Sequence, residues 1–169
     1  MLARHGDLVE AAREATWLLQ ADRNAKNLAA LAADLTGLSI INYRQGVYGG
    51  AAMLDESRTL ARSMGSKALE AGANHALAQS YGQRGPLGPV RELAATALVL
   101  YREAGRSDGI ASTLTTLGLA HLNAGDPIAA RRTLEEAAAI PLSVTPEDQV
   151  VAARVALARA VVALVESPW

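Results

Sequence analysis

The stretch LGLAHLNAGDPIAARRTLEEA, residues 117–137, decides which fold this sequence predicts. Gly125 is followed by Asp126, a preferred N-cap residue, and by Pro127, which fits the first position of a helix. Glycine at such a position commonly ends a helix, because it takes the left-handed backbone conformation at little cost. The stretch therefore predicts two helices joined by a tight turn.

The spacing of the apolar residues predicts how these two helices pack. Before the turn, Leu114, Leu117 and Leu122 recur at helical spacing, and Gly118 lies on the same side. Glycine inside a helix costs about 1 kcal/mol relative to alanine, so we expect Gly118 to be there because the second helix approaches closely. The second helix is predicted to end before Pro141. Its inward residues are predicted to be Ala130, Leu134 and Ala137, and its outward residues Arg131, Arg132, Glu135 and Glu136.

Glycine-containing corners recur at nearly constant intervals. The segments RHGD, RQGV, QRGP and NAGD place glycine at positions 6, 46, 85 and 125, which are 40, 39 and 40 residues apart. Self-similarity at such a period is typical of stacked-repeat proteins. The pattern predicts one all-α domain over residues 1–169 with about eight helices. These are a lone helix at 7–21, hairpins at about 26–64, 67–104 and 107–140, and a terminal helix at 147–166.

The third hairpin resembles the tetratricopeptide repeat (TPR), in which large and small apolar residues alternate at fixed offsets along two helices. Its matching residues are Leu114, Leu117, Gly118, His121, Ala130, Leu134, Ala137 and Pro141. A period near 40 residues is similar to the longer-helix TPR variants found in bacterial regulators. The resemblance implies a right-handed superhelical solenoid of antiparallel hairpins, whose concave groove binds a protein or peptide partner.

The resemblance also implies which residues line the groove, because the first helix of each hairpin faces it. They are Thr36, Ile40, Tyr43 and Arg44 in the first hairpin, His75, Gln79 and Gln83 in the second, and Thr115, Leu119, Leu122 and Asn123 in the third. Some TPR proteins hold a carboxylate with basic residues in this groove. Here Thr36, His75 and Thr115 stand at the places where basic residues are expected, which argues against such a clamp.

The terminal helix has an unusual composition, because residues 150–166 are valine, alanine or leucine except for Arg154, Arg159 and Glu166. Two interpretations stay open. The helix either folds over the last hairpin, or it docks on a second copy or on further sequence of a longer array. In the second case Val151, Val155 and Val162 are the predicted oligomer interface.

Composition and charge exclude several classes of protein. A formal net charge of −1 offers no net attraction to nucleic acid, and the absence of cysteine excludes disulfides and thiolate chemistry. The apolar run at 149–165 contains two arginines, each costing about 2.5–3.5 kcal/mol at the centre of a membrane span. We therefore expect no membrane span, and the lack of an apolar signal core in the first residues predicts a cytoplasmic protein.

The sequence shows no arrangement typical of catalysis or of metal binding. His5, His75 and His121 lie far apart, and none has a second ligand one helical turn away. The segment GQRGPLGP at 82–89 lacks the Gly-Lys-Ser/Thr ending of a phosphate loop and is interpreted as a turn. We therefore expect no enzyme activity, no cofactor and no metal.

The most direct functional hypothesis is a protein- or peptide-binding scaffold, as in TPR modules of bacterial regulatory or signalling proteins. Two alternatives stay open. One is a small-molecule sensor, in which Tyr43, His75 and Gln79 supply stacking and hydrogen bonds to the ligand. The other is a self-assembly domain that works through the terminal helix.

Overall fold

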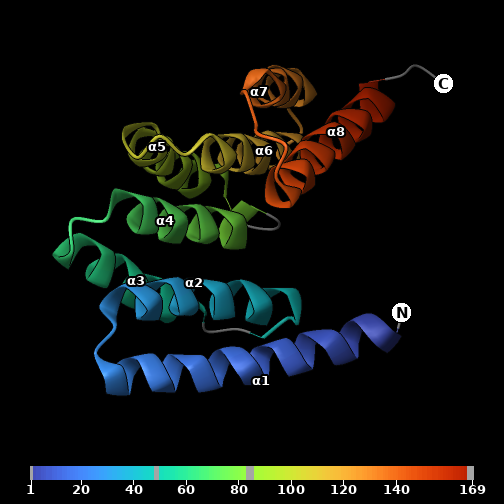
Figure 1. The fold of residues 1–169 in the computed structure, drawn as a ribbon. Coiled ribbons are helices and arrows are strands. Elements are labelled where there is room, and N and C mark those ends of the chain that lie inside the picture. Colours follow the sequence, from blue (N-terminus) through green and yellow to red (C-terminus); the bar gives the residue numbers. More distant parts are fainter. Residues whose placement is uncertain (1, 48–49, 83–85, 167–169) are drawn as a thin grey trace. The chain divides into compact units, whose positions relative to one another are not determined.

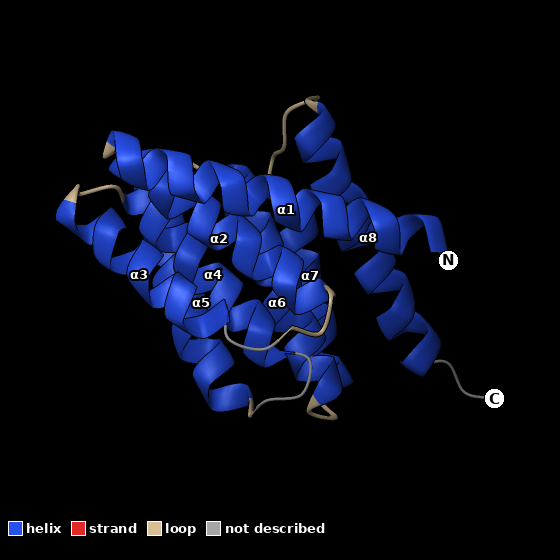
Figure 2. Ribbon diagram, turned by 90° about the horizontal axis from the view of Figure 1, so that it is seen from below, coloured by secondary structure: helices blue, strands red, loops and turns tan. Residues whose placement is uncertain are grey.

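The computed structural model describes residues 2–47, 50–82 and 86–166, with side chains described from residue 8 to residue 165 of these ranges. The described residues form eight α-helices and no strand, which confirms the prediction of an all-α chain (Figures 1 and 2). The helices are α1 (Leu2–Ala25), α2 (Leu28–Arg44), α3 (Gly50–Ser63), α4 (Lys67–Gly82), α5 (Leu87–Glu103), α6 (Ser107–Asn123), α7 (Pro127–Ala139) and α8 (Pro146–Glu166).

One predicted corner is wrong. Because α1 begins at Leu2, Gly6 lies inside a helix and not at a turn. A single glycine costs a helix only about 1 kcal/mol, which is too little to end it when Leu2, Ala3 and Arg4 before it favour the helical state.

The turns between helices repeat one backbone conformation. Gly46, Gly65, Gly105 and Gly125 all have positive φ, between 65° and 81°. The sequence predicts corners at Gly46 and Gly125, which lie in turns within hairpins. Gly65 and Gly105 lie in the turns that connect one hairpin to the next. Gly85 lies outside the described residues.

Lys26 takes this left-handed conformation without being glycine, with φ 55° in the turn between α1 and α2. Its side chain costs about 1 kcal/mol there relative to glycine, because Cβ crowds the following carbonyl oxygen. Lys26→Gly is therefore expected to raise the free energy of unfolding by about 0.5–1 kcal/mol. Denaturant unfolding followed by circular dichroism would measure the change. Gly46→Lys at the equivalent turn is the matched control and should destabilise, and a loss of stability in Lys26→Gly would contradict the argument.

The chain divides into two compact units, Met1–Ala76 and Leu77–Trp169, and the division falls inside α4. In the first unit α2 contacts both α1 and α3. Its core consists of Leu19, Leu31 and Leu35, against which Met53 and Leu60 pack.

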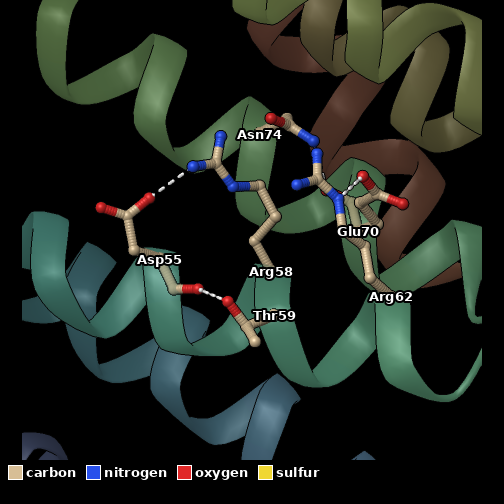
Figure 3. Close-up of polar contacts among 6 residues, drawn as sticks. All are labelled: Asp55, Arg58, Thr59, Arg62, Glu70 and Asn74. Atoms are coloured by element: carbon tan, nitrogen blue, oxygen red, sulfur yellow. Dashed lines mark hydrogen bonds and ion pairs between the residues drawn. The ribbon is translucent and has the colours of Figure 1, made fainter.

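Polar contacts add to this packing in the first unit. The buried Ser57 hydroxyl of α3 donates to the Ala32 carbonyl oxygen of α2 at 2.7 Å. Arg62 of α3 forms an ion pair with Glu70 at the start of α4 (Figure 3). The buried Asn74 side chain is satisfied within α4, since it donates to the Glu70 carbonyl oxygen at 2.9 Å.

In the second unit α6 is central, because it contacts α5, α7 and α8. One core cluster contains Leu98, Leu114, Ala137 and Val155, and a second contains Ala130, Leu134, Ala158 and Val162. Both clusters include residues of α8, which lies against α6 and α7 (Figure 1). The terminal helix thus folds over the last hairpin, as the first of the two interpretations expected.

The hairpin of α6 and α7 has the local structure that its sequence predicts. The Asp126 side chain accepts a hydrogen bond from the Ala129 amide at 2.9 Å, and Pro127 is the first residue of α7. Gly118 has the predicted packing role, because a Cβ added there would lie 2.7 Å from Leu134 Cγ. The right-handed solenoid and the single-domain organisation stay predictions.

Candidate interaction surface

The inner face of α8 belongs to the core of the second unit. Val155 and Val162 are 4% and 1% exposed, and the partly buried Val151 packs against the core cluster that contains Val155. These are the three valines that the sequence suggested as an oligomer interface. The structure places them inside the unit, so any interface made by α8 has to use another face of the helix.

A different face of α8 carries large apolar side chains that are exposed. These residues, which we call the α8 outer stripe, are Val150 (61% exposed), Leu157 (67%), Val161 (39%), Leu164 (72%) and Val165 (60%). Val150, Leu157 and Leu164 follow one another at intervals of seven residues, so they lie along one line of the helix. Ala153 and Ala160 are also exposed and flank this line. A partner helix could approach the stripe closely over these small side chains.

The extent of the outer stripe distinguishes it from ordinary surface residues. Single exposed apolar side chains are common on soluble proteins, whereas continuous apolar patches usually mark interaction sites. From Val150 to Val165 the stripe runs over roughly 22 Å of helix, at a rise of 1.5 Å per residue. This arrangement is suited to packing against another helix.

The opposite flank of α8 borders an open cleft of about 350 Å³ between α7 and α8. The residues that line it are Arg131, Glu135, Ala156, Arg159, Ala160, Val162 and Ala163. None of the residues expected to bind a small molecule, Tyr43, His75 and Gln79, belongs to this lining. The cleft therefore gives no support to the sensor hypothesis at those residues.

In the first unit, the predicted groove residues differ in their exposure to solvent. The Thr36 hydroxyl lies 2.9 Å from Ser57 Oγ, so it contributes to the contact between α2 and α3. Ile40, Tyr43 and His75 are half-buried, and Arg44 is exposed at the last turn of α2.

In the second unit, the predicted groove residues also have mixed surroundings. Thr115 is 2% exposed, and its hydroxyl donates to the Ala111 carbonyl oxygen at 2.7 Å, so it does not line a surface. Leu119 is 37% exposed, and Gln79 is half-buried. The Asn123 side chain donates a hydrogen bond to the Gly82 carbonyl oxygen at 3.0 Å, at the C-terminal end of α4. Leu122 packs on the core, and Gln83 lies outside the described residues.

Two observations concern the titratable side chains in the described part of the chain. It contains no group of three or more histidine, aspartate or glutamate side chains that could hold a metal ion. Asp34 lies near Asp22, and partial burial together with the neighbouring Asp22 carboxyl raises the pKa of Asp34. The described helices also include none with the length and apolarity that a membrane span requires.

Tyr101 titrates unusually because it is part of the core. Burial, with a smaller contribution from the Asp108 carboxylate, raises the pKa of Tyr101 to about 12. In the unfolded chain the tyrosine hydroxyl ionises near pH 10. The folded state is therefore stabilised fully by the neutral Tyr101 hydroxyl below pH 10, and this stabilisation is lost as the pH rises towards 12. The free energy of unfolding should fall by about 1.4 kcal/mol per pH unit in this range.

Denaturant unfolding at several pH values between 9 and about 12 would measure this slope. Tyr101→Phe is the control, because it keeps the ring and removes the titrating hydroxyl. An equal slope in the variant would contradict the assignment to Tyr101.

No protein-family model, no curated protein and no solved structure matches this chain. The α8 outer stripe was not among the sites predicted from the sequence, although the seven-residue spacing of Val150, Leu157 and Leu164 was a visible signal.

Proposed function

We propose that this chain is a non-enzymatic protein-interaction module, a TPR-like helical array that works in the cytoplasm as part of a bacterial regulatory or signalling protein. The observation that carries the proposal is the α8 outer stripe, a row of five exposed apolar side chains on a helix whose other side is already packed in the core. Exposing such a face costs free energy that a partner helix would recover.

The mode of binding follows from the geometry of α8. Helix-in-groove and helix-on-helix recognition use apolar anchors at intervals of three, four and seven residues. Val150, Leu157, Val161 and Leu164 have this spacing and come from one rigid helix. The partner is accordingly a protein that offers an apolar or aromatic helix face. Binding in the concave groove that the TPR resemblance implies stays a second prediction, with Arg44, Leu119 and Asn123 as its exposed residues.

A photo-crosslinking amino acid placed at Ala153 tests the proposal inside the native cells. Ala153 is exposed beside the outer stripe, so a bound protein should be captured at this position. The matched control carries the same crosslinker at Ala95, which is exposed on α5. We expect a protein crosslinked at 153 and not at 95, with the signal lost when Leu157→Glu and Leu164→Glu are added. The absence of any crosslink specific to position 153 would refute binding through α8.

A further inference from the structure

We propose that the cleft between α7 and α8 binds a free α-amino acid with an apolar side chain. This site goes beyond the proposed function, and it uses a different flank of α8 from the outer stripe. The cleft has a volume of about 350 Å³. Small-molecule sites span about 300–1,000 Å³, so a cleft at the lower end of this range suits a ligand of few atoms.

The charged side chains of the cleft come from both of its walls. Glu135 belongs to α7 and Arg159 to α8. Within the described part of the chain, neither side chain takes part in an ion pair, and the two do not pair with each other. A guanidinium group pairs well with a planar carboxylate, and a carboxylate pairs well with an ammonium group. A ligand that carries both charged groups can therefore bridge the two walls.

An α-amino acid has one counterpart for each of these charges. Its carboxylate would accept hydrogen bonds from the Arg159 guanidinium, and its ammonium group would donate to the Glu135 carboxylate. Arg131, one helical turn before Glu135, also lines the cleft. The two arginines and one glutamate give the lining a net charge of +1, so a ligand with an ammonium group and no carboxylate is disfavoured.

The rest of the lining is apolar and small, which defines the ligand's side chain. Ala156, Ala160 and Ala163 lie around Arg159 on α8, at intervals of three or four residues. Val162 also lines the cleft, and its side chain is 1% exposed because it is packed in the core. The alanine side chains leave room above the helix and offer no hydrogen-bonding group. An aliphatic side chain of the ligand would lie on this surface and bury apolar area.

An NMR titration of the isotopically labelled full chain with L-leucine tests the site. We expect saturable shifts of the backbone amides of residues 156–163, with a dissociation constant at or below about 1 mM. Isocaproate and isoamylamine are the matched ligands. Both keep the isobutyl group of leucine, but isocaproate lacks the ammonium group and isoamylamine lacks the carboxylate. Each should bind at least tenfold more weakly than leucine, because it leaves one wall of the cleft without a partner.

Substitutions of the two charged residues test their roles. Arg159→Gln and Glu135→Gln should each raise the dissociation constant for leucine at least tenfold. The matched controls are Arg132→Gln and Glu136→Gln, which change exposed residues of α7 that do not line the cleft. Both controls should bind leucine like the wild type. All four side chains are exposed, so no variant should change the melting temperature by more than a few degrees.

Ala156→Leu tests the cleft without changing its charge. Its larger side chain would occupy the space of the ligand, so leucine binding should be lost. Ala152→Leu is the control, because Ala152 is also exposed on α8 but does not line the cleft. This variant should bind leucine like the wild type.

Three outcomes would overturn the inference. The first is the absence of saturable shifts with leucine up to about 20 mM. The second is an equal affinity for leucine and for either matched ligand. The third is unchanged leucine binding in Arg159→Gln or in Glu135→Gln. The crosslink at Ala153 does not depend on these results, so the proposed function and the ligand site can each fail separately.

Discussion

Val162→Asp is expected to lower the free energy of unfolding of the second unit by at least about 4 kcal/mol. Val162 is 1% exposed and packs with Ala130, Leu134 and Ala158, so the new carboxyl would lie among apolar side chains without a partner. The variant also loses the burial of the valine side chain, which contributes about 1.5–3 kcal/mol. Such a loss is comparable to the total stability of many single domains.

Leu164→Asp is the matched control for this change. Leu164 is 72% exposed two residues further along α8, so its replacement should alter stability by no more than about 1 kcal/mol. Both positions lie near the end of the helix and share the same unfavourable interaction of an acid with the helix dipole. Urea unfolding followed by far-ultraviolet circular dichroism would compare them. A folded, stable Val162→Asp protein would mean that this valine is not in the core.

Leu134→Ala is expected to destabilise the second unit by about 3 kcal/mol, because it removes a fully buried side chain at the crossing of α6 and α7. Gly118→Ala is expected to destabilise it by about 1–2 kcal/mol. The added Cβ would lie 2.7 Å from Leu134 Cγ and 2.9 Å from Leu134 Cδ2, and the gain in helix propensity offsets only part of that clash.

The two changes should be strongly non-additive. Once Leu134 is alanine, the Cβ at position 118 fills part of the space that the leucine occupied, so Gly118→Ala becomes neutral or stabilising in that background. The coupling free energy from the double-mutant cycle should be about 2 kcal/mol. Gly37→Ala is the control for propensity alone, because a Cβ at Gly37 meets nothing within 4 Å, and it should stabilise the protein by up to about 1 kcal/mol. Additive effects at 118 and 134 would contradict the close crossing.

The sequence predicted the local structure of the third hairpin because short-range rules decide it. The left-handed Gly125, the Asp126 cap and the inward Ala130 and Leu134 each depend on residues within a few positions of one another. The bounds of α1 were predicted less well. Gly6 disfavours the helix by only about 1 kcal/mol relative to alanine, and the helix propensity of the neighbouring residues outweighs this cost.

The surface of α8 was harder to predict, for a different physical reason. Valine, leucine and alanine occupy almost its whole circumference, so the apolar pattern alone does not show which side packs on α6 and α7. The structure selects Val155 and Val162 for the core and leaves Leu157 and Leu164 exposed. Thr115 shows a similar limit, because a threonine whose hydroxyl bonds to its own helix can be fully buried, although its residue type suggests a surface position.

The central position of α6 in the second unit has a consequence for the order of events in folding. It packs against α5 and α7, its neighbours along the chain, and against α8, the next helix but one. Chains whose contacts connect nearby segments have a low contact order and fold within microseconds to milliseconds. An amide in the middle of α6 is covered from three sides, so it should exchange with solvent only when the whole unit opens. The amides of α8 can exchange when that helix alone detaches. Binding of a partner to α8 would therefore slow the hydrogen exchange of these amides more than that of the α6 amides.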